Sequence, residues 1–307
     1  MKTVLAGDIG GTKCRFALIT EDLQVLAVQQ VATSRDRAEF LHQLEAACRT
    51  IVAAVPAGMN PPSAIGLGTA GVIPRGGRLI TSAPNLPLDG FPLSAHLERS
   101  FGLPTTLIND GRASAFGEYL RGYAKGSDPL LCLFFGTGVG IGLLIGRRPF
   151  EGADNAAGEI GHTMYRLFGR KCPCGQLGHF EAYCGGRAIT ERAAAEIGPA
   201  QNGGEWTVGA VVASQHPSAE LILRDAFHAA ATLTANACTL LNPGAVVLGG
   251  GVLSGWPALR GSIEQFVRDN CSKSISQNVR FVETLGGSDA ILWGAAAATG
   301  ALALTSD

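Results

Sequence analysis

Two stretches decide the fold of this chain: VLAGDIGGTKCRFALI at residues 4–19 and LCLFFGTGVGIGLLI at residues 131–145. Each consists of an apolar strand, a glycine-rich turn and a second apolar strand, and the three parts fall at matching offsets. Each stretch also begins a run of alternating strands and helices, which is typical of a duplicated architecture. The sequence therefore predicts an α/β fold with two related halves.

Segments on both sides of these stretches continue the alternation. The expected helices are 35–55, 94–100, 111–120, 258–270 and one from about 288, and the expected further strands are 64–67, 105–109, 245–252 and 279–284. A polar, glycine-bearing stretch at 120–128 is the expected boundary between the halves. We therefore expect a small N-terminal lobe at 1–122, joined by the C-terminal helix at about 288–307. A larger C-terminal lobe at 123–287 carries a loop rich in cysteine and histidine.

Composition limits the function classes. Of the 307 residues, 46% are hydrophobic and 16% are charged, which suffices for a sizeable core. A net charge of −1 without a basic stripe argues against a nucleic-acid partner. The apolar run 226–241 contains His228 and Asn236, so we expect a buried helix and no membrane span. Few residues precede Asp8, so we expect no signal peptide, and the eight cysteines are too irregularly spaced for a disulfide framework. These features favour a soluble protein of the reducing cytoplasm.

The first glycine turn, GDIGGTKCR, has the composition of an anion site. Gly10 and Gly11 allow backbone amides to converge on a phosphate, and the Thr12 hydroxyl and Lys13 ammonium add donors. Asp8, at the end of a strand, can hold Mg²⁺ through its waters. The alternative is an ordinary hairpin turn. The Walker A spacing GxxxxGK[ST] is absent from this turn.

The second turn, FFGTGVGIG at residues 134–142, predicts another phosphate clamp at Gly136, Thr137 and Gly138. Strand residues follow this turn where a Rossmann fold requires a helix, so a dinucleotide fingerprint is disfavoured.

A third glycine group, LGGGV at residues 248–252, follows an apolar strand. Gly249, Gly250 and Gly251 would let an adenine and a ribose lie flat against the backbone. The alternative is a turn at the start of a helix.

The sequence IND at residues 108–110 places a carboxylate at the end of a strand. Asp110 at that position can accept a proton from a substrate hydroxyl. Strand-end aspartates are also common helix caps, and this alternative stays open.

A possible metal site lies between residues 161 and 181. His162, Cys172, Cys174 and His179 offer two nitrogen and two sulfur donors, a set that suits tetrahedral zinc. Four protein ligands leave no position for an activated water, so such a metal would be structural. Cys184 could replace one ligand, and the cysteines could instead be reduced core residues with unrelated histidines nearby.

Together these segments resemble the ROK family of sugar kinases and repressors, which belongs to the hexokinase–actin-like superfamily. The resemblance covers nearly the whole chain, and GEIGH followed by CPCGQLGHFE is its most specific part. It implies a duplicated actin/hexokinase-like (ribonuclease H-like) fold with two lobes and an active-site cleft between them.

The resemblance also implies roles for single residues. Asp110 matches the base that deprotonates the 6-hydroxyl of a sugar, and Glu159 and Glu181 match carboxylates that bind sugar hydroxyls. His162 matches a residue that binds sugar and zinc. The full set of expected sugar-binding residues is Gly71, Asn85, Asn109, Asp110, Glu159, His162 and Glu181. The expected nucleotide and magnesium residues are Asp8, Gly10, Gly11, Thr12, Lys13, Gly136, Thr137, Gly138, Gly249, Gly250 and Gly251, and the expected metal ligands are His162, Cys172, Cys174 and His179.

This chain departs from the family pattern at three places. His179 stands where the fourth zinc ligand is usually cysteine. GRAS follows Asp110, which places Arg112 near the cleft. Ala70-Gly71 replaces the usual Pro-Gly in the loop around the sugar's C2 substituent. The last two departures leave the identity of the sugar open.

The implied function is transfer of the γ-phosphoryl group of ATP to the 6-hydroxyl of a hexose, with Mg²⁺ and a structural Zn²⁺. Glucose is the first candidate. N-acetylglucosamine, N-acetylmannosamine, fructose and allose are the alternatives, and a donor other than ATP stays open. A non-catalytic sugar sensor is a weaker reading. A repressor is disfavoured because the phosphate turn at residue 7 leaves no room for a DNA-binding domain. A homodimer without nucleic-acid or membrane partners is the expected state.

Overall fold

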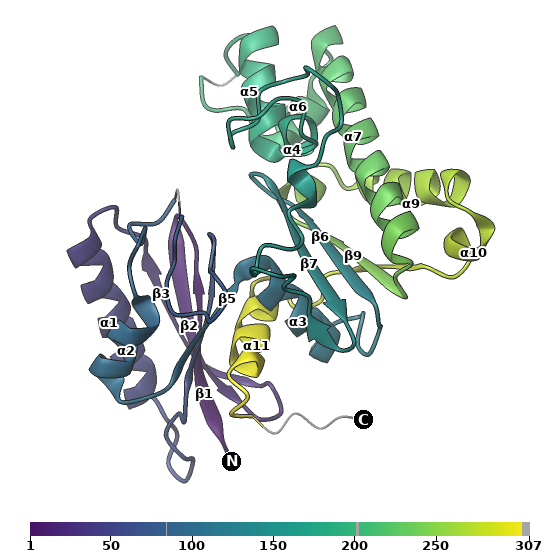
Figure 1. The fold of residues 1–307 in the computed structure, drawn as a ribbon. Helices are drawn as coiled ribbons and strands as arrows, with labels where there is room; N and C mark the ends of the chain where they lie inside the picture. Colours follow the sequence, from purple (N-terminus) through teal and green to yellow (C-terminus); the bar gives the residue numbers. More distant parts are fainter. Residues whose placement is uncertain (84, 201–202, 303–307) are drawn as a thin grey trace. The chain divides into compact units, whose positions relative to one another are not determined.

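The computed structural model describes residues 1–83, 85–200 and 203–302, and it confirms the predicted duplicated α/β architecture (Figure 1). The chain divides into two compact units. The first comprises residues 1–126, 142–157 and 285–307, and the second comprises residues 127–141 and 158–284. Two five-stranded sheets form the framework.

The first sheet has the strand order β3-β2-β1-β4-β5. Its strands are β1 (Thr3–Ile9), β2 (Lys13–Thr20), β3 (Val25–Ala32), β4 (Ile65–Thr69) and β5 (Thr105–Asn109). β1 pairs antiparallel with β2, while β1, β4 and β5 run parallel, so that Ile9, Thr69 and Asn109 are in register. The carboxyl ends of three strands therefore meet at one edge, where α/β sheets commonly bind ligands.

The strands predicted at 3–8, 14–19, 64–67 and 105–109 are confirmed. The strand β3 is not predicted from the sequence, because its apolar and polar residues do not alternate and none of its residues is fully buried. It is the edge strand beside β2, and it carries polar residues such as Gln29 and Gln30. An edge strand needs less apolar surface than a central one, so its periodicity is weak.

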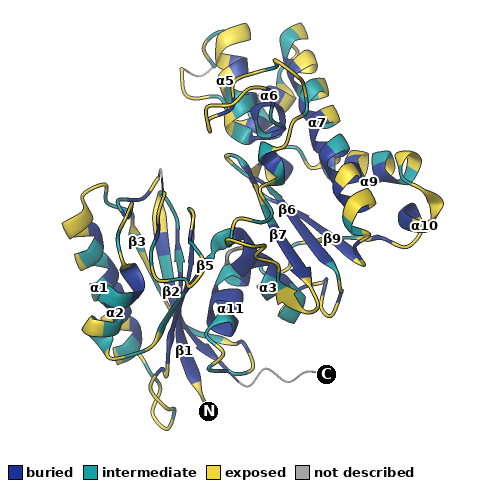
Figure 2. Ribbon diagram, in the orientation of Figure 1, coloured by how far each residue is buried: buried dark blue, intermediate teal, exposed yellow. Residues whose placement is uncertain are grey.

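Helices cover both faces of the first sheet. Leu5 packs with α1 (Arg37–Ala53) and α2 (Leu93–Phe101) in one core. Its neighbour Val4 packs with α11 (Ser288–Ala298) in another. The alternation follows from the two-residue period of a strand, because successive side chains point to opposite faces. Figure 2 shows the central strands and much of α11 as buried.

The helix α3 (Asp110–Arg121) lies against α11 through small residues. A Cβ atom added at Gly117 would overlap the carbonyl oxygen of Ala290, and one added at Gly294 would overlap that of Ala113. Only glycine permits so close an approach of two backbones. The N-terminus of α3, which bears Asp110, is thus held by close backbone packing.

The second sheet has the strand order β10-β9-β6-β7-β8. Its strands are β6 (Leu130–Phe135), β7 (Val139–Ile145), β8 (Arg148–Pro149), β9 (Ala245–Gly249) and β10 (Arg280–Glu283). β9 runs parallel to both β6 and β10. The turn between β6 and β7 corresponds to the turn between β1 and β2, as the repeated sequence pattern predicts.

The helices of the second unit are mostly packed around the long helix α7 (Pro217–Leu241) and α9 (Ala258–Asn270). The shorter helices are η1 (Ile160–His162), α4 (Glu181–Cys184), α5 (Gly186–Glu196), α6 (Val208–Ala213), α8 (Gly251–Gly255) and α10 (Lys273–Ser276). The buried helix predicted at 226–241 is the second part of α7. Within residues 1–83, 85–200 and 203–302, no helix combines the length and the apolar character that a bilayer crossing requires.

One strand prediction is wrong in extent. The strand expected at 245–252 ends at Gly249, and α8 begins at Gly251. Gly250 has a φ of +99°, and a Cβ atom there would come within 2.8 Å of the Phe135 nitrogen. This backbone conformation is open to glycine and ends the strand. The turn at the start of a helix, which the sequence left open, is therefore the observed structure.

Candidate active site

Two aspartates lie at the carboxyl edge of the first sheet. Asp8 is on β1, Asp110 follows β5, and β4 runs between these strands. The two carboxylates are near enough for the charge of Asp110 to raise the pKa of Asp8. Neighbouring carboxylates that repel each other are typical of sites that hold a cation or move a proton.

Asp110 has the environment of a proton acceptor. Its side chain is half-buried, and one carboxylate oxygen accepts a hydrogen bond from the Gly111 N–H at 2.8 Å. Burial raises the pKa of Asp110, and this effect outweighs the hydrogen bonds from Gly111 and Asn109 that lower the pKa. A raised pKa makes a carboxylate a stronger base for a hydroxyl proton.

The N-cap of α3 is Asn109 and not Asp110. The Asn109 side-chain oxygen accepts a hydrogen bond from the Arg112 N–H at 3.3 Å, and Asp110 is the first residue of the helix. The capping role, which the sequence also allowed for Asp110, thus belongs to its neighbour. Asp110 keeps a carboxylate that the helix cap does not require.

Asp8 is also in an unusual environment. Its pKa is raised from 3.8 to about 6, mainly by burial and next by the charge of Asp110. The cations of Arg15 and Lys13 oppose this shift. Arg15 and Lys13 therefore do not offset the free-energy cost of ionising Asp8 in the folded protein. A divalent cation nearby would stabilise the ionised carboxylate.

The turn between β1 and β2 is a tight hairpin connection. The Gly10 N–H donates to the Lys13 carbonyl oxygen at 3.2 Å, so this amide closes the turn. The side chains of Thr12 and Lys13 are exposed. A Cβ atom at Gly11 would lie 2.7 Å from the Cβ of Asn85, which places Asn85 against the turn. Glycine at position 11 permits this contact.

Gly71 follows the end of β4 in the same unit. Its φ is +113°, and a Cβ atom there would lie 3.1 Å from the Cβ of Ala83. The Val72 N–H donates to the Ser82 carbonyl oxygen at 2.8 Å, which holds the loop in a narrow hairpin. Any side chain at Gly71 would strain this loop.

In the second unit, Glu181 is bound to the turn between β6 and β7. One of its carboxylate oxygens accepts a hydrogen bond from the Val139 N–H at 2.8 Å. A Cβ atom at Gly138 would come within 2.8 Å of this carboxylate's carbon. The glycine at position 138 therefore makes room for Glu181, and the predicted sugar and nucleotide segments are in contact.

The same turn also receives the N-terminus of α5. The Gly186 N–H donates to the Gly136 carbonyl oxygen at 2.8 Å, and the Arg187 N–H donates to the Thr137 carbonyl oxygen at 3.0 Å. These bonds satisfy helix amides that would otherwise lack partners. They fix Arg187 beside the turn.

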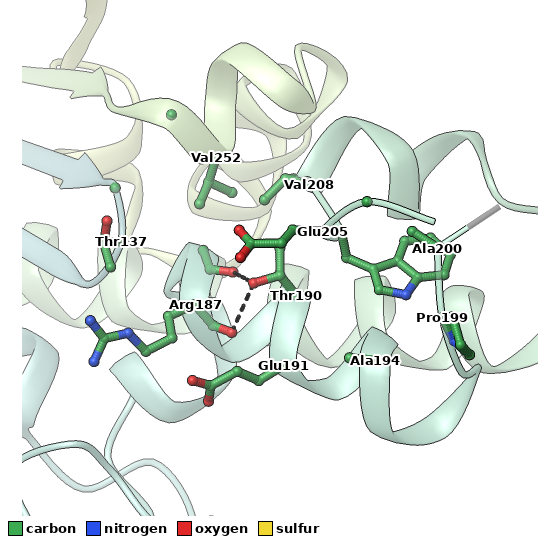
Figure 3. Close-up of a pocket in the computed structure, with 15 residues that line it drawn as sticks. Thr137, Arg187, Thr190, Glu191, Ala194, Pro199, Ala200, Glu205, Val208 and Val252 are labelled. Atoms are coloured by element: carbon green, nitrogen blue, oxygen red, sulfur yellow. Dashed lines mark hydrogen bonds between the residues drawn. The ribbon is translucent and has the colours of Figure 1, made fainter. Parts of the chain in front are cut away.

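A cavity of about 690 Å³ opens next to this turn (Figure 3). Its size is within the range of small-molecule sites. Thr137, Arg187, Thr190 and Glu191 lie along one side in Figure 3, and the Thr190 hydroxyl donates to the Gly186 carbonyl oxygen at 3.1 Å. The lining residues are Gly136, Thr137, Gly186, Arg187, Thr190, Glu191, Ala194, Pro199, Ala200, Gly204, Glu205, Trp206, Val208, Gly251 and Val252.

Several of these lining residues are not predicted from the sequence. Arg187, Glu191 and Trp206 fall outside every glycine motif. The pair Gly185-Gly186 at the start of α5 was the available signal, since it resembles the other glycine turns that the sequence predicts to bind a ligand. Of the predicted triple glycine, Gly251 lines the cavity.

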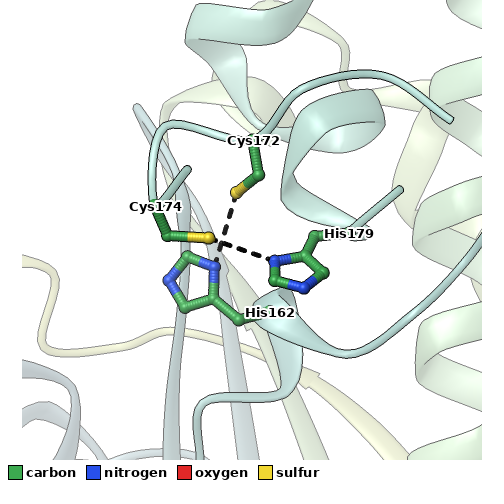
Figure 4. Close-up of side chains that lie close together, drawn as sticks. All are labelled: His162, Cys172, Cys174 and His179. Carbon is green, nitrogen blue, oxygen red and sulfur yellow. Dashed lines mark hydrogen bonds between the residues drawn. The ribbon is translucent and has the colours of Figure 1, made fainter. Parts of the chain in front are cut away.

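The four predicted metal ligands converge (Figure 4). One donor atom from each of His162, Cys172, Cys174 and His179 lies within 4.8 Å of the others. The Cys172 sulfur is 3.5 Å from His162 Nδ1, and the Cys174 sulfur is 3.2 Å from His179 Nδ1. Ligands of tetrahedral zinc lie roughly 3.3–3.8 Å apart, given the Zn–N and Zn–S bond lengths. The donor types suit this metal, and these two distances lie near that range.

Cys184 is not part of this cluster. Its buried thiol donates to the Phe180 carbonyl oxygen at 3.3 Å. The alternative that Cys184 replaces His179 as a ligand is therefore disfavoured by the geometry. The alternative of unrelated cysteines and histidines is disfavoured as well, because the four donors meet at one point.

Glu159 lies beside the metal cluster. Its carboxylate is 3.9 Å from His162 Nε2, and its side chain is 62% exposed. A carboxylate this accessible can accept hydrogen bonds from a bound ligand. His162 is thus within reach of both the metal donors and an exposed acceptor.

Comparison with known proteins supports the resemblance to the ROK family. Residues 4–302 match the ROK family. Glucokinase of Streptomyces coelicolor is 33% identical over 195 residues, which are 63% of this chain and 59% of that protein. The chain thus spans about three fifths of the length of this glucokinase. N-acetylmannosamine kinase of Yersinia pestis is 34% identical over 250 residues, or 81% of this chain and 82% of that protein.

Solved structures agree in fold. The ROK glucokinase of Streptomyces griseus in complex with glucose and AMPPNP has a TM-score of 0.79 at 28% identity, over 96% of this chain and 98% of that one. The ROK hexokinase of Thermus thermophilus has a TM-score of 0.81 at 28% identity, over 96% of both chains. The predicted actin/hexokinase-like fold is confirmed. Because the family match extends over nearly its whole length, this chain belongs to the ROK family.

Proposed function

We propose that this protein is an ATP-dependent sugar kinase that phosphorylates the 6-hydroxyl of a hexose, with glucose as the first candidate. The observation that carries the proposal is Asp110, a half-buried carboxylate with a raised pKa that is not used as the helix cap. Family membership and the glucokinase relatives support the choice of reaction and sugar.

In this proposal Asp110 accepts the proton of the 6-hydroxyl as the oxygen attacks the γ-phosphorus. Asn109 and Asn85 bind neighbouring sugar hydroxyls, and Gly71 keeps the loop beside the C2 substituent narrow. Phosphoryl transfer depends mainly on positioning and on neutralisation of charge. The protein therefore has to hold the hydroxyl and the base in line, and burial keeps the base strong.

Asp8 would hold Mg²⁺ through its waters, and Mg²⁺ would neutralise charge on the transferred phosphoryl group. The raised pKa of Asp8 fits this role, because a bound cation stabilises the ionised carboxylate. Lys13 and Thr12 would donate to phosphate oxygens.

The cavity beside Thr137 is the proposed nucleotide site. Its exposed carboxylates, Glu191 and Glu205, can accept hydrogen bonds from ribose hydroxyls, and Trp206 offers an aromatic surface for the adenine. Arg187 supplies a cation for the phosphates. ATP is the proposed donor, and AMPPNP in the Streptomyces griseus relative supports it.

His162, Cys172, Cys174 and His179 would hold Zn²⁺, which would cross-link the loop between them. Glu181 begins α4 two residues after His179, and its carboxylate accepts a hydrogen bond from the Val139 N–H. We propose that this double anchorage aims His162, Glu159 and Glu181 at the sugar's hydroxyls. The metal has no direct part in phosphoryl transfer.

An N-acetylmannosamine kinase is the second candidate, because a relative of that name matches 82% of its own length. N-acetylglucosamine, fructose and allose remain further substrates to test, and a cytoplasmic homodimer remains the expected state.

The test is a coupled ADP-release assay with ATP and each of these sugars. With inorganic polyphosphate as the donor, where no ADP forms, the sugar phosphate itself is measured. Asp110→Asn should lower kcat by about a hundredfold or more while sugar binding persists, because the base is lost and the shape is kept. Asp269→Asn, an exposed change of the same chemistry on α9, is the matched control. A wild-type protein that binds sugar and MgATP without turnover would support a sensor and overturn the kinase proposal.

A further inference from the structure

We propose that Arg112, with Asn155, is a positioning residue that ties together three segments bearing substrate-binding groups. The inference rests on the proposed function. The sequence pattern placed Arg112 near the cleft, and the structure buries it at 5% exposure. Its guanidinium binds residues 155–157 of the same unit.

The guanidinium of Arg112 binds one short segment through several acceptors. Nη1 donates to the side-chain oxygen of Asn155, while Nη2 donates to the Asn155 carbonyl oxygen at 3.0 Å and to the Ala157 carbonyl oxygen at 2.9 Å. A buried guanidinium costs free energy unless its donors are satisfied. The planar fork of arginine can serve these acceptors at once, whereas a lysine ammonium on a flexible stem fits such a set poorly.

Asn155 extends the link to a third segment. Its side-chain nitrogen donates to the Ile73 carbonyl oxygen at 2.6 Å. Its φ is +60°, a left-handed conformation that few residues other than glycine adopt and that asparagine tolerates. Glycine would suit the backbone equally well, but it could bind neither Ile73 nor Arg112 through a side chain. The oxygen and the nitrogen of the Asn155 side-chain amide therefore each make a hydrogen bond.

Each linked segment leads directly to a proposed substrate group. Arg112 is two residues after Asp110, Ile73 is two residues after Gly71, and Ala157 is two residues before Glu159. The raised pKa of Asp110 arises from its burial, against its own hydrogen bonds. We therefore expect Arg112 to act by holding backbone in place.

The first experiment compares steady-state kinetics of Arg112→Lys and Asn155→Gly with the wild type. We expect the KM for the hexose to rise by roughly tenfold, because small displacements of positioning groups are costly, while the KM for MgATP stays within about twofold. The acid limb of the kcat profile against pH should stay in place, since Asp110 keeps its environment. Because the two residues form one link, the double variant should be no worse than the poorer single variant.

Arg148→Lys is the matched control, since Arg148 is exposed and lies in the same 142–157 segment. Equal rises in the KM for both substrates, or additive effects of the two changes, would overturn the positioning role. So would a shift of the acid limb by about one pH unit, because it would make Arg112 an electrostatic partner of the base.

A second measurement does not depend on turnover. In ligand-free protein, Arg112→Lys and Asn155→Gly should speed amide hydrogen exchange in residues 71–74 and 151–157, and exchange in β1 and β2 should be unchanged. Unchanged exchange in both loops would refute the link. Wild-type protein without kinase activity on any sugar would refute the proposed function instead, while this exchange result would still decide the link.

Discussion

Asp8→Asn should make the ligand-free protein more stable while abolishing efficient turnover. The pKa of Asp8 is raised from 3.8 to about 6, chiefly by burial and then by the neighbouring charge of Asp110. The folded state therefore disfavours ionised Asp8. Each pKa unit corresponds to about 1.4 kcal/mol, so the shift amounts to about 3 kcal/mol at neutral pH. Asparagine keeps the size of the side chain and removes this cost.

The sign of the pH dependence is fixed by the direction of the shift. A carboxyl group with a raised pKa in the folded state is protonated in both states well below pH 3.8, where the cost is absent. The cost grows as pH rises from 3.8 to about 6 and is complete above that range. The stability difference between Asp8→Asn and wild type should therefore be near zero at about pH 3 and about 3 kcal/mol at pH 7.5.

The assay has to report on the first unit, because a chain with two compact units need not unfold in one step. Native-state hydrogen exchange of the paired amides in β1 and β2 does so. Asp269→Asn, on the second unit, should leave these amides unchanged. If Asp8→Asn were no more stable than wild type at pH 7.5, or if its advantage were the same at pH 4.5, the electrostatic reasoning would be refuted. A loss of turnover together with the gain in stability would agree with the magnesium role.

Three further predictions concern the metal, a helix contact and the second turn. Cys172→Ala, or treatment with a chelator, should release about one equivalent of zinc, and calorimetry should show hexose binding lost before nucleotide binding; equal loss of both would contradict the structural role. Gly294→Ala should destabilise the first unit by about 1–3 kcal/mol in denaturant unfolding, because the new methyl group meets the Ala113 carbonyl, and an unchanged midpoint would disprove that contact. Gly138→Ala should raise the KM for hexose and for ATP together, since its methyl group would displace Glu181, and normal values for both would speak against this contact.

Local patterns in the sequence were enough to predict most strands and helices of the fold. The paired strand–turn–strand units, the helix α1 and the strand that ends at Asn109 follow from hydrophobic periodicity and glycine turns, which depend on neighbours along the chain. The cluster of candidate metal ligands could be predicted for a similar reason. Cys172, Cys174 and His179 are close in sequence, so a short loop brings their donor atoms together.

Only the tertiary structure decided which polar groups meet across long sequence distances. Asp8 and Asp110 approach each other because β1, β4 and β5 are in parallel register, and Arg112 reaches Asn155 because residues 142–157 fold onto the first unit. Glu181 likewise binds Val139 at a distance of 42 positions. Periodicity along a chain indicates which face of a strand or helix is buried, but it carries no information about the partner on the other side. The direction of the Arg112 side chain toward Asn155 and Ala157 therefore depended on packing alone.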